Sequence, residues 1–153
     1  MYPVMLNLQD KQVIVVGGGR VAARKIKMLQ ATGAVITVIS PTLAPTIDRQ
    51  QLNWVARAYQ TGDLAQANLI IACTDDLAVN AQVRQDAGPG QLVNNTSNKY
   101  ASDFYNMAMV SQDDVALAVS THGSSPKLAK KIRQLLTIWL QAKPWQKGRN
   151  ETK

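Results

Sequence analysis

The residues with the clearest chemical signature form a glycine turn after the apolar segment 13–16. Gly17, Gly19 and Ala22 match the pattern G-x-G-x-x-A. In dinucleotide-binding folds the first glycine permits a tight turn and the second lets the backbone approach a pyrophosphate. The third small residue lets the helix pack close to the strand. The pattern predicts a dinucleotide-binding turn, with a plain strand–turn–helix crossover as the alternative.

The predicted cofactor-binding groups at this turn are backbone N–H donors. They belong to Gly17, Gly18, Gly19, Arg20 and Val21, which span the turn and the helix start. Free N–H groups at a helix N-terminus favour an anion such as a pyrophosphate. The Arg20 side chain either adds positive charge there or is solvated.

Further cofactor contacts are expected where other strands end, since open α/β sheets bind ligands at the carboxyl edge. Ser40 ends the second predicted strand, where NAD-binding folds often carry an acidic residue for the ribose. Serine can bind a ribose hydroxyl but cannot repel a 2′-phosphate, so the residues leave NAD and NADP both open. Thr74 and Asp75 follow the fourth strand and are expected to line the cofactor, although helix capping also explains this segment.

A second polar cluster opens the last predicted helix. Ser125 suits the N-cap and Pro126 the first turn, so capping alone accounts for the segment. A helix N-terminus that carries hydroxyls and is followed by lysine also forms an anion site. Ser124, Ser125 and Lys127 are therefore candidate ligands for an anionic substrate.

A metal site is not predicted. His122 is the only histidine, and it lacks cysteine or carboxylate neighbours at ligand spacing. Cys73 is the only cysteine, lies in an apolar run, and is expected to be a small buried hydrophobic residue.

Composition and charge restrict the class of protein. Hydrophobic residues make up 46% of the 153-residue chain, which is typical of a globular protein. No apolar run approaches the roughly 20 residues of a membrane span, and no secretory signal is recognisable, so we expect a cytoplasmic protein. The formal charge of +7 suits a polyanion. Because no nucleic-acid motif is present, a small anionic substrate is the preferred partner.

Residues 1–100 alternate between extended and helical patterns, which predicts a Rossmann-like, doubly wound parallel sheet. Strands are expected over 12–16, 34–39, 54–58, 69–73 and 91–93. Helices are expected over 21–31, 44–51 and 76–87.

Residues 101–142 follow a different pattern. Extended runs over 104–110 and 115–120 flank the polar turn 111–114 and predict a hairpin, and an amphipathic helix is expected over 126–140. A hairpin and one helix cannot bury their apolar faces well, so we expect a homodimerisation segment, with docking on the chain's own sheet as the alternative. Residues 143–153 are predicted to be a polar tail.

Three segments together resemble the precorrin-2 dehydrogenase / sirohydrochlorin ferrochelatase family, the dehydrogenase part of sirohaem synthase. They are MYPVMLNLQDKQVIVVGGGRVAARK (1–25), IIACTDDLAVN (70–80) and LAVSTHGSSPKLAKKIR (117–133). The resemblance implies NAD-dependent oxidation of precorrin-2 to sirohydrochlorin and a dimer interlocked through its middle segment. It also implies that Ser125 is the serine of the tetrapyrrole site, and it favours NAD over NADP.

The chain departs from the family at one functional position. Family members carry an aspartate three residues after the asparagine of the fifth-strand turn, where it acts in dehydrogenation and chelation. Aligned on Asn94, that catalytic position is Ser97. Loss of a general base typically costs about 10²–10⁴-fold in rate. Asp103 is the nearest carboxylate that could replace it, although the family uses that position structurally.

Two function hypotheses follow. The first is a short precorrin-2 dehydrogenase, impaired by Ser97 and with doubtful chelatase activity because no metal-handling carboxylate lies at the expected position. Larger members continue into a C-terminal helical domain that helps close the tetrapyrrole cleft, so an open cleft is expected to weaken substrate binding and water exclusion. The second is a relative that binds NAD or tetrapyrrole as a sensor or carrier. A nucleotide-gated domain of the potassium-transport type is disfavoured by the absent acidic residue after the second strand.

Overall fold

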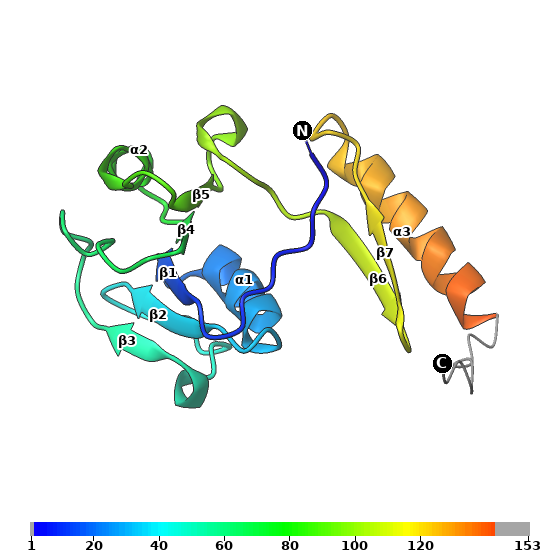
Figure 1. Cartoon of the computed structure of the whole chain (residues 1–153), viewed down its shortest axis with the longest axis horizontal. Helices are drawn as coiled ribbons and strands as arrows, with labels where there is room; N and C mark the ends of the chain where they lie inside the picture. Colours follow the sequence, from blue (N-terminus) through cyan, green and yellow to red (C-terminus); the bar gives the residue numbers. More distant parts are fainter. Residues whose placement is uncertain (1, 143–153) are drawn as a thin grey trace, which may run out of the picture. The chain divides into compact units, whose positions relative to one another are not determined.

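The computed structural model describes residues 2–142, and it divides the chain into two compact units, residues 1–105 and 106–153 (Figure 1). Each unit is described by itself. The predicted polar tail, 143–153, lies outside the described residues.

Unit 1 is built on a five-stranded sheet in which every pair of neighbours is parallel. Its strands are β1 (Gln12–Val16), β2 (Val35–Ile39), β3 (Asn53–Val55), β4 (Leu69–Ala72) and β5 (Leu92–Asn95). Their spatial order is β3-β2-β1-β4-β5. The order reverses between β1 and β4, so a crevice is expected beyond their carboxyl ends.

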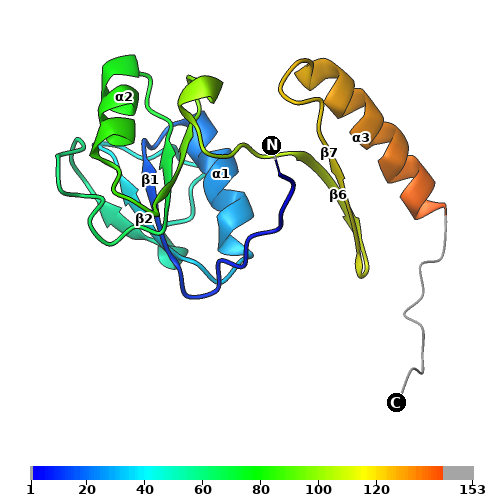
Figure 2. The same cartoon turned by 45° about the horizontal axis from the view of Figure 1, so that its top comes forward.

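Helices α1 (Arg20–Gln30) and α2 (Leu77–Asp86) cover opposite faces of this sheet (Figure 2). Ile26 of α1 packs in the same cluster as Val13 and Val15 of β1. Val83 of α2 belongs to the other cluster, with Val16 of β1. Successive β1 side chains point to opposite faces, and both faces are buried, which explains the unbroken apolar sequence of the strand. The predicted doubly wound sheet is confirmed.

The predicted helix over 44–51 is wrong. Only a 3₁₀ turn, η1 (Arg49–Gln51), forms there, with the Asp48 carboxylate accepting a hydrogen bond from the N–H of Gln50. The N–H of Ala44 donates to the carbonyl of Gly18 at 2.7 Å. The start of this segment is therefore tied to the glycine turn, and Pro45 supplies no N–H of its own.

The third strand is shorter than its predicted range of 54–58. It ends at Val55, and the Arg57 guanidinium then forms two hydrogen bonds to the Asp63 carboxylate, at 2.8 and 2.7 Å. This ion pair fixes the loop between β3 and β4, and one side of that loop will face the cavity described below.

Unit 2 contains a hairpin and a helix. Its elements are β6 (Ala108–Gln112), β7 (Val115–Val119) and α3 (Pro126–Gln141). Gln112 pairs with Val115, so the turn has only two residues instead of the predicted 111–114. The first strand begins later than the predicted residue 104 because Phe104 packs on the core of unit 1.

Candidate active site

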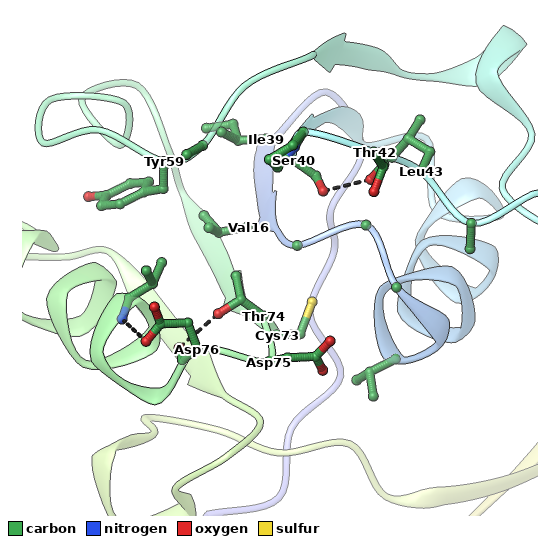
Figure 3. Close-up of a pocket in the computed structure, with 18 of the residues that line it drawn as sticks. Val16, Ile39, Ser40, Thr42, Leu43, Tyr59, Cys73, Thr74, Asp75 and Asp76 are labelled. Atoms are coloured by element: carbon green, nitrogen blue, oxygen red, sulfur yellow. Dashed lines mark hydrogen bonds between the residues drawn. The ribbon is translucent and has the colours of Figure 1, made fainter.

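A cavity of about 620 Å³ opens at the carboxyl ends of β1, β2 and β4 (Figure 3). The glycine turn forms its floor, with Ser40 and Thr42 on one side and the segment Thr74–Asp76 on the other. All eight predicted cofactor-binding residues line it: Gly17, Gly18, Gly19, Arg20, Val21, Ser40, Thr74 and Asp75. These residues come from three segments that are distant in sequence, and the topology brings the segments to one crevice at the switch point of the sheet.

The first two glycines of the turn are required by the packing of the folded chain, independently of any ligand. Gly17 has a φ of +119°, and a Cβ there would lie 2.7 Å from the carbonyl oxygen of Cys73. A Cβ on Gly18 would collide with the carbonyl oxygen of Thr42. Neither position has room for a side chain, so these glycines serve the close packing of the turn between its neighbours.

Gly19 differs from its two neighbours, because a Cβ there would meet nothing within 4 Å. Gly19 is the N-cap of α1 and makes no side-chain capping hydrogen bond, and the first turn of α1 has no acidic residue. Amide N–H groups at such a terminus are available to an anion. The open space above Gly19 therefore fits the close approach of a pyrophosphate, and the residues present fit a dinucleotide.

Ser40 is 7% exposed, and its hydroxyl donates to the carbonyl oxygen of Thr42 at 2.6 Å. Its backbone carbonyl accepts a hydrogen bond from the Trp54 indole at 2.9 Å. Ser40 thus lines the cavity, and its hydrogen bonds brace the loop that follows β2 and join it to Trp54 of β3. The expected hydrogen bond from this hydroxyl to a ribose would have to replace its bond to Thr42.

In the segment after β4, one residue caps helix α2 and its neighbours line the cavity. The Asp76 carboxylate caps α2, accepting from the N–H groups of Ala78 at 2.8 Å and Val79 at 3.3 Å. Asp75 is exposed and lines the cavity, and Thr74 is bound to Asn80 of α2. Capping and cavity lining therefore coexist.

Cys73 is buried at the cavity wall. Burial raises the pKa of its thiol to about 12. The thiol is neutral at physiological pH, in agreement with the expected role as a small hydrophobic residue.

Ser97 follows β5 and is held by two neutral amides. Its hydroxyl donates to Oδ1 of Asn95 at 2.6 Å and accepts from Nδ2 of Asn80 at 3.3 Å. Neither amide is a base at neutral pH, so these two contacts do not activate the hydroxyl for proton transfer.

Asp103 has both carboxylate oxygens engaged. They accept from the Arg84 guanidinium at 2.7 and 2.9 Å, and Oδ2 also accepts from the N–H of Val93 at 2.9 Å. This bidentate pair connects α2, β5 and the segment after η2 (Lys99–Ala101). The geometry suits a structural group better than a general base.

The predicted substrate residues lie in unit 2, at the start of α3. Ser125 is the N-cap, and its hydroxyl oxygen accepts from the N–H of Leu128 at 3.2 Å. The Ser124 hydroxyl donates to the carbonyl of Thr121 at 2.5 Å. The turn before them has positive φ at His122 and Gly123, and Lys127 is exposed on the first turn of α3.

Comparison with known proteins identifies the family. Residues 4–108 match the family model described as putative NAD(P)-binding, and residues 112–137 match sirohaem biosynthesis protein central. Precorrin-2 dehydrogenase of Bacillus subtilis is 36% identical over 138 residues, covering 88% of this chain and 85% of the relative. The chain belongs to the precorrin-2 dehydrogenase family. A solved structure of SirC, precorrin-2 dehydrogenase, superposes with a TM-score of 0.81 at 36% identity and covers 92% of this chain and 76% of that one.

Larger proteins contain the same unit. Siroheme synthase 1 of Serratia proteamaculans is 33% identical over 145 residues, which cover 92% of this chain but only 30% of that protein. These comparisons confirm the family membership that the three sequence segments predicted. They also confirm the NAD-binding domain and NAD as the cofactor.

Several residues that line the cavity were not predicted from the sequence, and the most notable of them is Tyr59. Its ring lies at the end of the cavity away from α1 (Figure 3). The phenol donates to Oδ2 of Asp86 at 2.7 Å, and burial followed by this hydrogen bond raises the pKa of Tyr59. Position 59 lies beyond β3 with no motif around it. Its only sequence signal was a lone aromatic residue near a predicted strand end.

Metal-ligand clusters and membrane-spanning helices were sought within residues 2–142, the part of the chain that the structure describes. No group of three potential metal ligands occurs there, and no helix there is both long and apolar enough to cross a membrane.

Proposed function

We propose that this chain catalyses the NAD-dependent oxidation of precorrin-2 to sirohydrochlorin in sirohaem biosynthesis. The observation that carries the proposal is the open space beside Gly19, which lines a cavity that is also lined by residues following β2 and β4. The membership of the precorrin-2 dehydrogenase family supplies the substrate. The names of the relatives favour this enzyme over the alternative of a sensor or carrier.

NAD⁺ supplies a hydride acceptor when it is bound, and the chain's residues bind and orient it. The N–H groups of the glycine turn and of the first turn of α1 would hold the pyrophosphate. Thr74 and Asp75 would border the cofactor on the β4 side. Tyr59, Ile39 and Val79 also line this cavity, and an apolar lining of this kind suits a planar base.

The tetrapyrrole is expected to use unit 2. Precorrin-2 carries eight carboxylates, and the start of α3 offers hydroxyls, a helix N-terminus and the exposed Lys127. We propose that Ser124, Ser125 and Lys127 bind substrate carboxylates. The support is the N-cap position of Ser125 and the absence of acidic residues from the first turn of α3.

Hydride loss from the tetrapyrrole must be accompanied by loss of a proton. Ser97 stands at the family's aspartate position and is bound to neutral amides, while the Asp103 carboxylate is engaged by Arg84. We propose that the proton leaves to water or to a substrate carboxylate, and that turnover is correspondingly slow. Metal insertion, which releases two protons, is disfavoured for the same reason.

We also propose a homodimer formed through unit 2. Leu135 is 59% exposed and Ile138 is 66% exposed on α3, and Leu128 and Trp139 are also exposed. An apolar face of this kind on a small unit is typical of an interface. Sedimentation equilibrium tests this: a dimer is expected, and a monomer at micromolar concentration would contradict it.

A cytoplasmic location is proposed because NAD⁺ and a tetrapyrrole with eight carboxylates are charged metabolites that do not cross membranes unaided. Cell fractionation with an antibody to the chain would test it.

The reaction itself is tested by anaerobic incubation with precorrin-2 and NAD⁺. Sirohydrochlorin should form faster than it does without protein, while NAD⁺ binding without turnover would favour the sensor or carrier.

A further inference from the structure

Asn80, in the first turns of α2, is a polar side chain with no exposed surface. A buried amide is costly unless its hydrogen-bonding groups are satisfied. It is not needed to cap α2, because Asp76 already accepts from the N–H groups of Ala78 and Val79. Its burial therefore calls for a different explanation.

The side-chain amide of Asn80 forms hydrogen bonds to Thr74, which lies in the cavity wall. Its Oδ1 accepts from the N–H of Thr74 at 3.0 Å and from the Thr74 hydroxyl at 2.9 Å. Its Nδ2 donates to the carbonyl oxygen of Thr74 at 3.0 Å. The backbone N–H and carbonyl of Thr74 are thus fixed by a single amide, while the Thr74 hydroxyl lies within hydrogen-bond distance of both Asn80 Oδ1 and, at 2.8 Å, the carbonyl oxygen of Asp76. Thr74 directly lines the cavity that holds the cofactor in the proposed function.

The other side of Asn80 reaches the loop after β5. Nδ2 also donates to the Ser97 hydroxyl oxygen at 3.3 Å. The backbone carbonyl of Asn80 accepts from Nδ2 of Asn95 at 3.3 Å, and Asn95 in turn accepts from the N–H of Ser97 at 3.0 Å. The loop that carries Ser97 is therefore bound to α2 through Asn80 twice, by side chain and by backbone.

We infer that Asn80 is a positioning residue, which fixes the cofactor-binding wall at Thr74 relative to the loop that carries Ser97. This inference rests on the proposed function and deepens it. It assigns a role to a residue outside both the glycine turn and the start of α3. Because reacting groups must be held within fractions of an ångström, a shift between these two segments reduces turnover.

The isosteric variant Asn80→Asp keeps an acceptor for Thr74 but removes both Nδ2 donors. It places a carboxylate oxygen against the Thr74 carbonyl. We expect kcat per folded molecule to fall about 10²-fold, with a much smaller change in KM for NAD⁺. The matched control, Asn53→Asp on the exposed edge strand, makes the same chemical change and should leave kcat unaltered. A kcat for Asn80→Asp within twofold of wild type would overturn the inference.

Because a buried carboxylate can prevent folding, a second measurement leaves Asn80 in place. Thr74→Val removes the hydroxyl on one side of Asn80, and Ser97→Ala removes it on the other. If Asn80 couples the two sides, their effects on the NAD⁺ dissociation constant, measured by titration, should be non-additive by about threefold or more. Additive effects would refute the coupling.

These two readouts separate the inference from the proposed function. Absence of wild-type turnover would refute the proposed reaction, while the NAD⁺ titrations would still decide whether Asn80 couples Thr74 to Ser97. Turnover by the wild type with additive titrations and an unaffected Asn80→Asp variant would retain the reaction and reject the role of Asn80.

Discussion

The Nζ atom of Lys25 lies 3.0 Å from Oδ1 of Asn94, and both side chains are buried. This hydrogen bond joins α1, whose first turn faces the cofactor cavity, to β5. Asn94 in turn donates from Nδ2 to the carbonyl oxygen of Phe104 at 2.9 Å. The bonds thus connect the helix of the glycine turn to the last segment of unit 1, and Lys25 should contribute to stability in a pH-dependent way.

Burial, followed by repulsion from Arg24, lowers the pKa of Lys25 below its ordinary value of 10.5. Between the folded and unfolded pKa values the unfolded chain binds more protons, so the free energy of unfolding rises with pH. Lys25→Met lacks this contribution. The stability of the wild type relative to Lys25→Met should therefore increase between about pH 7 and about pH 10. Chemical denaturation at both pH values measures it, and a pH-independent difference would contradict the buried amine.

Gly19→Val should fold but fail to bind NAD⁺, since its side chain would enter only the space reserved for the pyrophosphate. Gly17→Val provides the contrast, because φ is +119° and a Cβ would lie 2.7 Å from the Cys73 carbonyl. We expect Gly17→Val to lose about 1–3 kcal/mol of stability from backbone strain alone. Thermal unfolding and NAD⁺ titration distinguish the two. Normal NAD⁺ affinity in Gly19→Val would refute the cofactor site.

Ser97→Asp should raise kcat about 10²-fold or more, because it supplies a carboxylate base where the chain has none. Ser97→Asn is the matched control, with similar size but no basic group, and should give no increase. Both are measured by the anaerobic formation of sirohydrochlorin. Equal kcat values for the two variants would show that a base at this position does not limit the rate.

Asp103→Asn should reduce stability more than turnover. The substitution breaks the bidentate pair with Arg84, while the amide oxygen can still accept from the N–H of Val93. The pair is partly exposed, so we expect a loss of only about 1 kcal/mol. Urea denaturation and kcat are compared in the same preparation. A loss of turnover of 10²-fold in folded protein would instead identify Asp103 as the base.

Cys73 should resist alkylation in the folded protein, because burial raises its pKa to about 12 and thiolate is the reactive form. Iodoacetamide at about pH 8 should label it only after denaturation. The extent of labelling is read by mass spectrometry. Rapid labelling of the folded chain would contradict the burial of this side chain.

Features that depend on local patterns were predictable from the sequence. The apolar β1 segment followed by Gly17 and Gly19 indicated both the first strand and the cofactor turn, and Pro126 after Ser125 indicated the start of α3. Each of these signals lies within a few residues, where backbone preferences decide the structure.

Features that depend on long-range hydrogen bonds were not predictable. The helix expected over 44–51 does not form, and the N–H of Ala44 at the start of this segment is bound to Gly18, 26 positions earlier in the chain. Ser40 was expected to contact a ribose, but in the structure its hydroxyl is bound to Thr42. Asn80 reads as an ordinary helix residue, and only its complete burial between Thr74 and Ser97 reveals its contacts.

Anaerobic turnover of precorrin-2 with NAD⁺, compared between the wild type and Gly19→Val, tests the central claim most directly. The proposed function predicts that the wild type forms sirohydrochlorin and NADH in equal amounts, faster than the spontaneous reaction, and that Gly19→Val gives only the spontaneous rate. A wild type that binds NAD⁺ but matches the spontaneous rate would contradict the assignment as a dehydrogenase and leave a protein that only binds the cofactor.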